Sequence, residues 1–351
     1  MSEPVYDVVI AGAGYAGLAA AGELGARALL IDQHAVGAIQ RSACAIPLAS
    51  ADRFDARDAI LQVYPSGFVH TPYGTTRFAL DPPYCIFDHA ALCHRLFERS
   101  GAAFLRARVR GIDGDTVVTT AGSVRGRLFI DASGWPAALA TARRPDLAMD
   151  HRLTVGIEAE VPGRADGIHF WFDRSIVHRG YAWVFPAGET LRVGVATYDA
   201  AAGVDLAGAL QRFLRGMGLD GRPVRGGHIP WFTRPATIGN VFLTGDAAGL
   251  PLPLTAEGIR FALHYGALAG RIARAIVDGE RSLPEGSRAY EQAVRRHRRR
   301  AAVMRWAQRI VGPMQHGGIH LAAEIAARPG VASRLMQRHA RWSEELAWRG
   351  A

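Results

Sequence analysis

The sequence feature that most constrains the fold is a glycine motif close to the N-terminus. An apolar run at residues 6–11 is followed directly by Gly12, Gly14 and Gly17, in the spacing G-x-G-x-x-G. The residues after the motif favour a helix, and a second short strand ends at Asp32, 20 residues beyond Gly12. This succession of strand, glycine turn, helix, strand and acidic residue is typical of the first βαβ unit of a dinucleotide-binding domain. We therefore predict an α/β fold with a Rossmann-like domain.

The three glycines have separate roles in such a motif. Gly12 permits the tight turn, Gly14 lets a pyrophosphate approach the backbone, and Gly17 lets the helix pack closely on the strand. The helix N-terminus offers unpaired N–H groups and a partial positive charge to the phosphates. Asp32 is placed to accept hydrogen bonds from ribose hydroxyls. The alternative is a glycine-rich turn that serves packing alone.

A second motif lies about 230 residues after the first and helps to distinguish an FAD site from an NAD site. A predicted strand at 240–244 enters Gly245 and Asp246, and a proline-rich loop then leads to a long helix that starts at about Glu257. The acidic residue can bind a polyol chain. The helix N-terminus can place positive potential beside the pyrimidine ring of a flavin. The pair of motifs therefore favours FAD over NAD.

Strand-forming and helix-forming segments divide the rest of the chain. Alternating strands and clustered aromatic residues at 152–200 indicate an antiparallel sheet in a separate unit, and the chain after residue 286 is helical and basic. We expect a discontinuous cofactor domain (1–65, 86–145 and 236–285), an inserted antiparallel-sheet substrate domain (66–85 and 146–235) and a basic helical C-terminal segment (286–351).

Three further stretches carry a resemblance to a known family: Asp131–Gly134 (DASG), Tyr181–Pro186 (YAWVFP) and Ala256–Ile259 (AEGI). With the two motifs above, they resemble the FAD-dependent group that holds aromatic hydroxylases and geranylgeranyl reductases. Within that group the sequence is most similar to the geranylgeranyl reductase family. The resemblance covers roughly residues 5–285.

This resemblance implies noncovalent FAD and a set of cofactor-binding residues. They are Gly12, Gly14, Ala16, Gly17, Asp32, Arg41, His89, Val109, Asp131, Gly245, Asp246, Gly258 and Ile259. His89 stands where the family has an arginine, which is a departure from the family pattern. No second Rossmann motif is visible, so NAD(P)H or another electron donor is expected to bind transiently.

Two residues are candidates for catalysis. Cys44 precedes an alanine where the family often has Cys-Gly, and the resemblance places it against the flavin, where it could donate a proton. We expect its thiol to ionise more easily beside Arg41. The alternative is that Cys44 acts as a small buried hydrophobe. Glu257 is either an acid beside the flavin or a charge at a helix N-terminus.

The aromatic residues Tyr181, Trp183 and Phe185 alternate along one predicted strand, so they point to the same face. They form either the wall of an apolar substrate pocket or ordinary sheet core. His228 is either an acid near that pocket or an ordinary loop histidine.

These features favour an FAD-dependent oxidoreductase that reduces or oxidises C–C bonds of an apolar, prenyl-like molecule by hydride transfer at flavin N5. An FAD-dependent monooxygenase acting on an aromatic or polyene molecule is the main alternative. An isomerase resembling lycopene cyclases and a non-enzymatic flavin-binding protein also remain open. All 41 basic residues are arginines, which excludes mechanisms that need a lysine, including that of flavin halogenases.

The positive charge is concentrated at the C-terminus. Residues 271–351 contain 16 arginines and 7 acidic residues, and the remainder of the chain is balanced. We expect either a solvated helical face or attraction to an anionic membrane or acidic partner. No nucleic-acid motif accompanies the arginines, and the three cysteines lack metal-ligand spacing, so we expect neither nucleic acid nor metal. Without an apolar run long enough to span a bilayer, a cytoplasmic location with at most peripheral membrane contact is expected.

Overall fold

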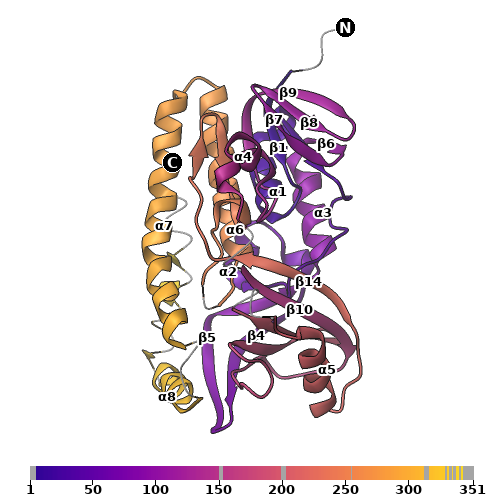
Figure 1. Ribbon diagram of the computed structural model, residues 1–351, viewed down its shortest axis with the longest axis vertical. Helices are drawn as coiled ribbons and strands as arrows, with labels where there is room; N and C mark the ends of the chain where they lie inside the picture. Colours follow the sequence, from indigo (N-terminus) through magenta and orange to yellow (C-terminus); the bar gives the residue numbers. More distant parts are fainter. Residues whose placement is uncertain are drawn as a thin grey trace.

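A computed structural model describes residues 5–149, 153–198, 203–253, 255–311 and 316–328, together with 330–331, 334, 337–339 and 341–342. Its strands form two sheets, called A and B here, which occupy the upper and lower halves of Figure 1. The long helix α7 (Leu283–Val311) runs along one side of the molecule.

Sheet A has the parallel core of a dinucleotide-binding fold. Its order is β15 (Thr237–Ile238), β16 (Val241–Leu243), β9 (Gly122–Asp131), β1 (Val5–Ala11), β2 (Ala28–Asp32) and β6 (Ala103–Arg106). The strands from β16 to β6 are parallel, and β15 is antiparallel to β16. Strands β7 (Val109–Asp113) and β8 (Thr116–Thr119) continue from β9 as an antiparallel meander. The predicted α/β, Rossmann-like fold is thus confirmed.

Helices cover this sheet because its central strands are apolar on both faces. Val8–Ala11 of β1 and Ala28–Ile31 of β2 are buried. Helix α1 (Tyr15–Leu24) packs against α3 (His89–Ser100) and α6 (Ile259–Val277), and the short helix α4 (Ala138–Arg143) packs against β7. Such near-continuous apolar runs are typical of parallel strands covered on both sides.

Sheet B is mostly antiparallel and carries the aromatic strand. Its order is β14 (Pro223–Pro230), β10 (Leu153–Pro162), β13 (Thr190–Thr197), β12 (Gly180–Ala187), β11 (Ile168–Trp171), β4 (Ile60–Thr71), β5 (Gly74–Phe87) and β3 (Ala45–Pro47). Only β11 and β4 pair in parallel among these strands. Strand β3 and the start of β4 come from the segment 1–65, so this segment contributes to both sheets. Helix α5 (Leu206–Gly216) covers β10 and β13, and α2 (Leu48–Arg53) follows β3.

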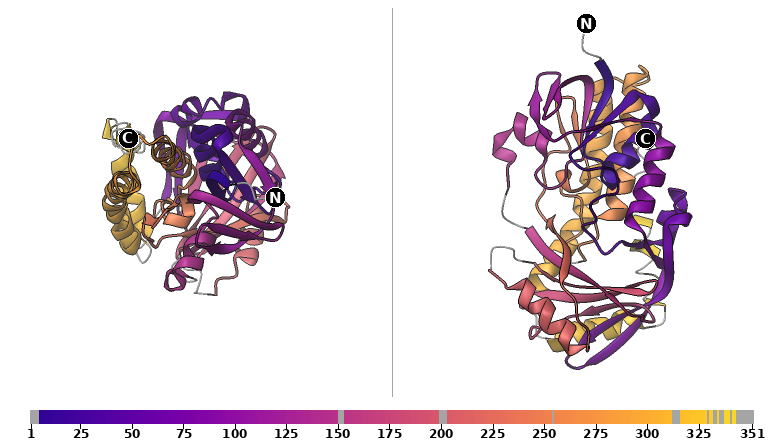
Figure 2. Two further views of the ribbon diagram at one scale, coloured as in Figure 1. Left: turned by 90° about the horizontal axis from the view of Figure 1, so that it is seen from above. Right: turned by 90° about the vertical axis from the view of Figure 1, so that its right-hand side faces the viewer.

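The C-terminal part is helical, as predicted, over the residues that the structure describes. Helix α7 packs against α6, and α8 (His316–Ala327) packs against β4 and β5 (Figure 2). No helix in the described ranges combines the length and the apolar character that crossing a membrane requires.

Helices α1 and α6 approach each other unusually closely, through small residues. A Cβ atom added at Gly266 would lie 2.2 Å from the carbonyl oxygen of Ala16, and one added at Gly270 would lie 2.4 Å from that of Ala20. A Cβ at Gly245 would lie 3.1 Å from the Cβ of Ala16. The two glycine-containing motifs, far apart in sequence, are therefore in direct contact.

This contact predicts the effect of one added methyl group. Gly266→Ala places its Cβ against backbone that cannot rotate away, so we expect a loss of about 1–3 kcal/mol in the free energy of unfolding. Gly22→Ala is the matched control, because nothing lies within 4 Å of a Cβ at this position of α1. The control should gain about 0.5–1 kcal/mol. Urea unfolding of both variants checks this, and equal stability would contradict the close packing.

Candidate active site and cofactor cradle

The first glycine motif has two tightly packed positions and one open position. Gly12 has a φ of +102°, and a Cβ there would lie 2.3 Å from the carbonyl oxygen of Ala132. A Cβ at Gly17 would lie 1.9 Å from the carbonyl oxygen of Gly12. By contrast, a Cβ at Gly14 would meet no atom within 4 Å. The backbone at Gly14, which is the N-cap of α1, is therefore free to receive a ligand such as a pyrophosphate.

Asp32 is attached to this motif by its own carboxylate. The carboxylate accepts hydrogen bonds from the backbone nitrogens of Ala13 and His34, both at 2.9 Å. These bonds hold Asp32 beside the turn at the end of β2. Its predicted contact with a ribose remains a prediction.

The second motif presents an unpaired carboxylate. Asp246 lies in a short turn, Gly245–Ala248, and a Cβ at Gly258 would lie 3.8 Å from its Oδ1. Among the described residues, no group donates a hydrogen bond to the Asp246 carboxylate. Burial raises the pKa of Asp246 to about 6, against the positive charge of Arg41, which lowers it. Helix α6 begins at Ile259, directly beside this carboxylate.

These observations fit a bound dinucleotide with a polyol chain. Gly14 offers open backbone at the N-terminus of α1, and Ala16 and Gly245 join the two motifs at one place. Asp246 adds a half-buried carboxylate that accepts no hydrogen bond from the described protein groups and is therefore free to accept one from a ligand.

Two predicted site residues have structural roles. Asp131 is fully buried, and its two carboxylate oxygens accept hydrogen bonds from the backbone and hydroxyl of Ser133 and from the backbone nitrogens of Leu139 and Ala140. The expected contact of Asp131 with a cofactor stays a prediction. This carboxylate is occupied in fixing the start of α4.

Glu257 belongs to a buried cluster of ion pairs. Its carboxylate lies 2.7 Å from Arg260 Nε and 2.6 Å from His339 Nε2. Burial raises the pKa of Glu257, but the charges and hydrogen bonds of Arg260 and His339 outweigh burial and hold it at about 2. Glu257 is therefore ionised near pH 7, which favours the alternative of a charge at the helix N-terminus over an acid beside the flavin. Its contacts attach the C-terminal stretch to the start of α6.

Cys44 lies at the centre of a buried polar cluster. Its Sγ donates to the carbonyl oxygen of Ser42 at 3.2 Å and lies 3.5 Å from the Tyr15 hydroxyl. The Tyr15 hydroxyl in turn lies 2.6 Å from Nδ1 of His89. Cys44, Tyr15 and His89 thus form a hydrogen-bonded chain, called the Cys44 cluster below. Neither Tyr15 nor this chain was identified from the sequence.

The protonation states within the Cys44 cluster differ from the sequence-based expectation. Burial raises the pKa of the Cys44 thiol, and the cation that opposes this rise is Arg192 rather than Arg41. Cys44 is therefore a thiol, not a thiolate. Burial likewise lowers the pKa of His89 to about 4, so its ring is neutral near pH 7 and does not replace the positive charge of the family's arginine.

The aromatic row of β12 lies on the face of sheet B from which Arg192 reaches the segment around Cys44. Trp183 pairs with Gly194 of β13, and Phe185 pairs with Arg192, so these side chains share one face. Arg192 donates hydrogen bonds from this face to the carbonyl oxygens of Ala43 and Phe87. The ring centroids of Tyr181 and Trp183 lie 5.8 Å apart, and those of Trp183 and Phe185 lie 6.5 Å apart. The row is therefore continuous and lies toward the segment that carries Cys44.

Trp183 occupies a space that two glycines leave for it. A Cβ at Gly194 would lie 2.0 Å from Cζ2 of Trp183, and one at Gly156 would lie 3.3 Å from Cη2. Trp183 Nε1 donates to Glu158 Oε2 at 3.0 Å. Glu158 is buried, which raises its pKa, and it is ion-paired with Arg225. Sequence analysis missed Glu158, although an acidic residue in an apolar strand was a possible signal.

His228 does not join this row. It pairs with Val155, which packs toward the α5 side of sheet B, whereas Gly156 and Glu158 lie on the face of the row. Its ring centroid lies 5.5 Å from that of Trp135. The expected role of His228 as an acid near the pocket therefore stays a prediction, and its observed aromatic neighbour is Trp135.

Comparison with known proteins identifies the kind of enzyme. No protein-family model matches the chain. It is 27% identical over 304 residues to the digeranylgeranylglycerophospholipid reductase of Methanococcus vannielii, and the match covers 77% of each chain. The chain is a homologue of the geranylgeranyl reductases. The family resemblance seen in the sequence is thus confirmed.

Solved structures show the same fold. A geranylgeranyl bacteriochlorophyll reductase-like protein of Thermoplasma acidophilum aligns with a TM-score of 0.83 at 18% identity, covering 99% of this chain and 98% of that chain. The p-nitrophenol 4-monooxygenase of Pseudomonas putida DLL-E4 aligns with a TM-score of 0.76 at 16% identity, covering 100% of both chains. These neighbours show the fold, and the named reductase relatives support an oxidoreductase of the FAD-dependent kind.

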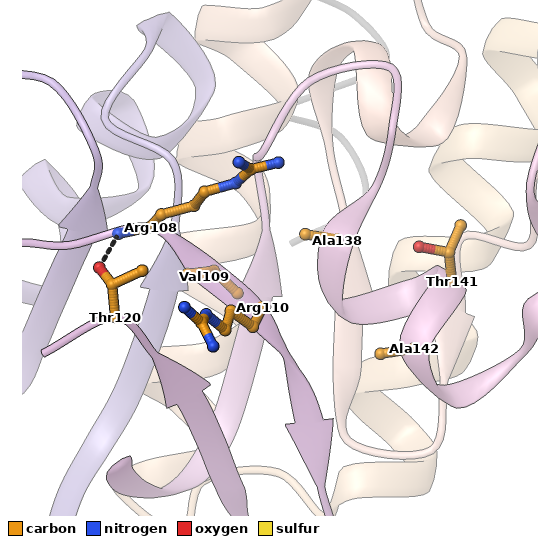
Figure 3. A pocket seen from close by; sticks show the side chains of 7 residues that line it. All are labelled: Arg108, Val109, Arg110, Thr120, Ala138, Thr141 and Ala142. Carbon is orange, nitrogen blue, oxygen red and sulfur yellow. Dashed lines mark hydrogen bonds between the residues drawn. The ribbon is translucent and has the colours of Figure 1, made fainter. Parts of the chain in front are cut away.

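An open pocket lies beside one further predicted FAD residue, Val109. It has a volume of about 630 Å³ and lies between the β7–β8 meander and α4 (Figure 3). Its lining residues are Arg108, Val109, Arg110, Thr120, Ala138, Thr141 and Ala142. The pocket shares no residue with the Cys44 cluster or the aromatic row, so it is separate from the expected substrate face.

Asp246 gives a prediction in which affinity and stability change in opposite directions. Asp246→Asn should weaken FAD binding about ten- to a hundredfold, because a charge-assisted hydrogen bond is lost. The FAD-free variant should be more stable than the wild type at pH 7. The pKa of Asp246 rises from 3.8 to about 6 on folding, so ionisation costs the wild type up to about 3 kcal/mol above pH 6.

The sign of this effect sets the pH range of the measurement. Because the folded pKa is raised, the stability advantage of the variant should grow between pH 4 and pH 6 and vanish below pH 4. Chemical unfolding of both apoproteins across this range, with FAD titrations at pH 7, tests both parts. Unchanged FAD affinity in the folded variant would reject the role of Asp246.

Proposed function

We propose that this enzyme reduces carbon–carbon double bonds in the prenyl chain of a lipid-like molecule. The observation that carries the proposal is the aromatic row of Tyr181, Trp183 and Phe185, which lies on the face of sheet B directed toward Cys44. A row of apolar rings suits a polyene chain and is poor for a charged sugar or phosphate. The relative from Methanococcus vannielii bears the name of a reductase of such lipids.

The residues around Cys44 support the chemistry of this reduction. When bound, reduced FAD supplies a hydride at N5. The second carbon of the double bond then needs a proton, and Cys44 retains one because burial raises its pKa. The Tyr15 hydroxyl lies 3.5 Å from its sulfur and is positioned to replace that proton. Trp183 and Phe185 hold the apolar chain and exclude water.

The electron donor is part of the same proposal. The sequence contains one pair of dinucleotide motifs, which FAD occupies in the proposed holoenzyme. We infer that NAD(P)H or another reductant binds transiently and leaves before the apolar substrate reacts.

A monooxygenase is the second candidate, favoured by one observation. The p-nitrophenol 4-monooxygenase of Pseudomonas putida shares the fold over the whole chain, and a row of aromatic side chains also suits an aromatic ring. The two candidates differ in their products: a reductase adds two hydrogens for each double bond, whereas a monooxygenase adds one oxygen atom and consumes O₂.

In the test, a geranylgeranyl lipid is added to the chemically reduced holoenzyme in the absence of oxygen. We expect the lipid to reoxidise the flavin and to gain hydrogen by mass spectrometry. Cys44→Ser should slow this step about 10²–10⁴-fold, the range for loss of a general acid. Cys85→Ala is the matched control, because Cys85 is also a buried free thiol but forms no hydrogen bond with the Cys44 cluster.

Two outcomes would overturn the proposal. Flavin that stays reduced until O₂ is admitted, with an oxygenated product, would establish the monooxygenase instead. Equal rates for Cys44→Ser and Cys85→Ala would remove Cys44 from the proton transfer and leave only the apolar pocket.

A further inference from the structure

Helix α8 is oriented with its polar side chains toward the protein. His320 Nδ1 lies 3.1 Å from the Thr71 hydroxyl, and the Thr76 hydroxyl donates to Glu324 Oε1 at 2.5 Å. His316 Nε2 accepts a further hydrogen bond from the backbone of Arg174. These contacts attach the polar side of α8 to the β4–β5 hairpin and its surroundings.

The opposite side of α8 exposes apolar residues. Leu321 and Ile325, one helical turn apart, are 60% and 46% exposed, and none of the residues of this helix is buried. An amphipathic helix at the surface of a protein in water normally turns its apolar side inward. The reversed orientation indicates that something apolar covers this side.

The second half of α7 has the same character. Val303 and Trp306 are 68% and 64% exposed, and Ile310 follows one turn later, also exposed. The buried side of this helix, which includes Tyr290 and Ala301, faces elsewhere. The spacing of three and four residues places the exposed apolar side chains in a single stripe.

The two helices that carry these exposed apolar residues are neighbours. Figures 1 and 2 show α8 beside the C-terminal end of α7. Tyr73, exposed at the tip of the β4–β5 hairpin, has its ring centroid 6.3 Å from that of His320 on α8. The C-terminal apolar face, as we call it, consists of Tyr73, Val303, Trp306, Ile310, Leu321 and Ile325.

Arginines accompany this face. The exposed arginines on the same two helices and just beyond them include Arg295, Arg299, Arg309 and Arg328. Apolar residues that enter the headgroup region, with tyrosine and tryptophan at the interface and arginines near phosphates, are the pattern of a protein that lies on an anionic membrane. A second copy of this chain would bring like charges together at the same face.

We propose that the C-terminal apolar face binds an anionic phospholipid bilayer, with α7 and α8 lying in the plane of the surface. Apolar contact anchors Leu321, Ile325 and Trp306 among the lipid headgroups, and the surrounding arginines provide charge selectivity. This inference goes beyond the proposed reaction and does not depend on it, because no residue of the face belongs to the Cys44 cluster or the aromatic row.

The experiment is co-sedimentation of the full-length holoenzyme with vesicles. One set of vesicles contains phosphatidylcholine alone, and the other contains phosphatidylcholine with phosphatidylglycerol. We expect binding to the anionic vesicles that weakens as salt is raised. Arg299→Gln and Arg309→Gln should each lower the partition coefficient about fivefold on anionic vesicles only, the equivalent of about 1 kcal/mol per arginine.

The apolar contribution is tested separately with a matched control. The double variant Leu321→Ser/Ile325→Ser should lower binding by more than about tenfold, since several buried CH₂ groups are lost. Val224→Ser removes an equally exposed apolar side chain from β14, at the opposite end of sheet B from β5, and should bind like the wild type. Retained FAD absorbance and an unchanged melting temperature show that each variant is folded.

The proposal fails if the wild type does not bind anionic vesicles, or if the Leu321/Ile325 variant binds as well as the Val224 control. It also fails if the wild type is a dimer in solution that the same double variant dissociates while vesicles are not bound. In that case a second copy, not a membrane, covers the face.

Discussion

The close approach of α1 and α6 is the constraint on which the cofactor site depends. It exists because Gly266 and Gly270 carry no side chain where α6 crosses the backbone at Ala16 and Ala20. This approach brings the turn at Gly245 against the first glycine motif, so that the two motifs form one cradle. A larger residue at any of these positions would separate the phosphate-binding turn from the carboxylate of Asp246.

Polar contacts hold the segment that carries Cys44 against the second sheet. Arg192 reaches from β13 to the carbonyl oxygens of Ala43 and Phe87, on either side of the segment that places Cys44. The same strand pair orients Trp183 and Phe185 toward that segment. The aromatic row and Cys44 are thus positioned by a single set of contacts, which gives the buried Arg192 a structural role.

The sequence predicted those parts of the site that depend on local geometry. The glycines of the first motif and the acidic residue at Asp246 are recognisable because a turn and a strand end fix them within a few residues. The roles of Glu257 and Cys44 were predicted less well, because their partners, His339 and Tyr15, are distant in sequence. The face on which His228 lies depends on strand register, which cannot be deduced from a single sequence.

The central claim is that the two motifs together form one FAD site, and titration of the apoprotein tests it most directly. FAD added to the unfolded-and-refolded or dialysed apoprotein should lose its free-flavin fluorescence until one FAD is bound per chain. The account predicts saturation at that ratio, with no comparable binding of NAD. A folded apoprotein that binds NAD but not FAD would contradict it.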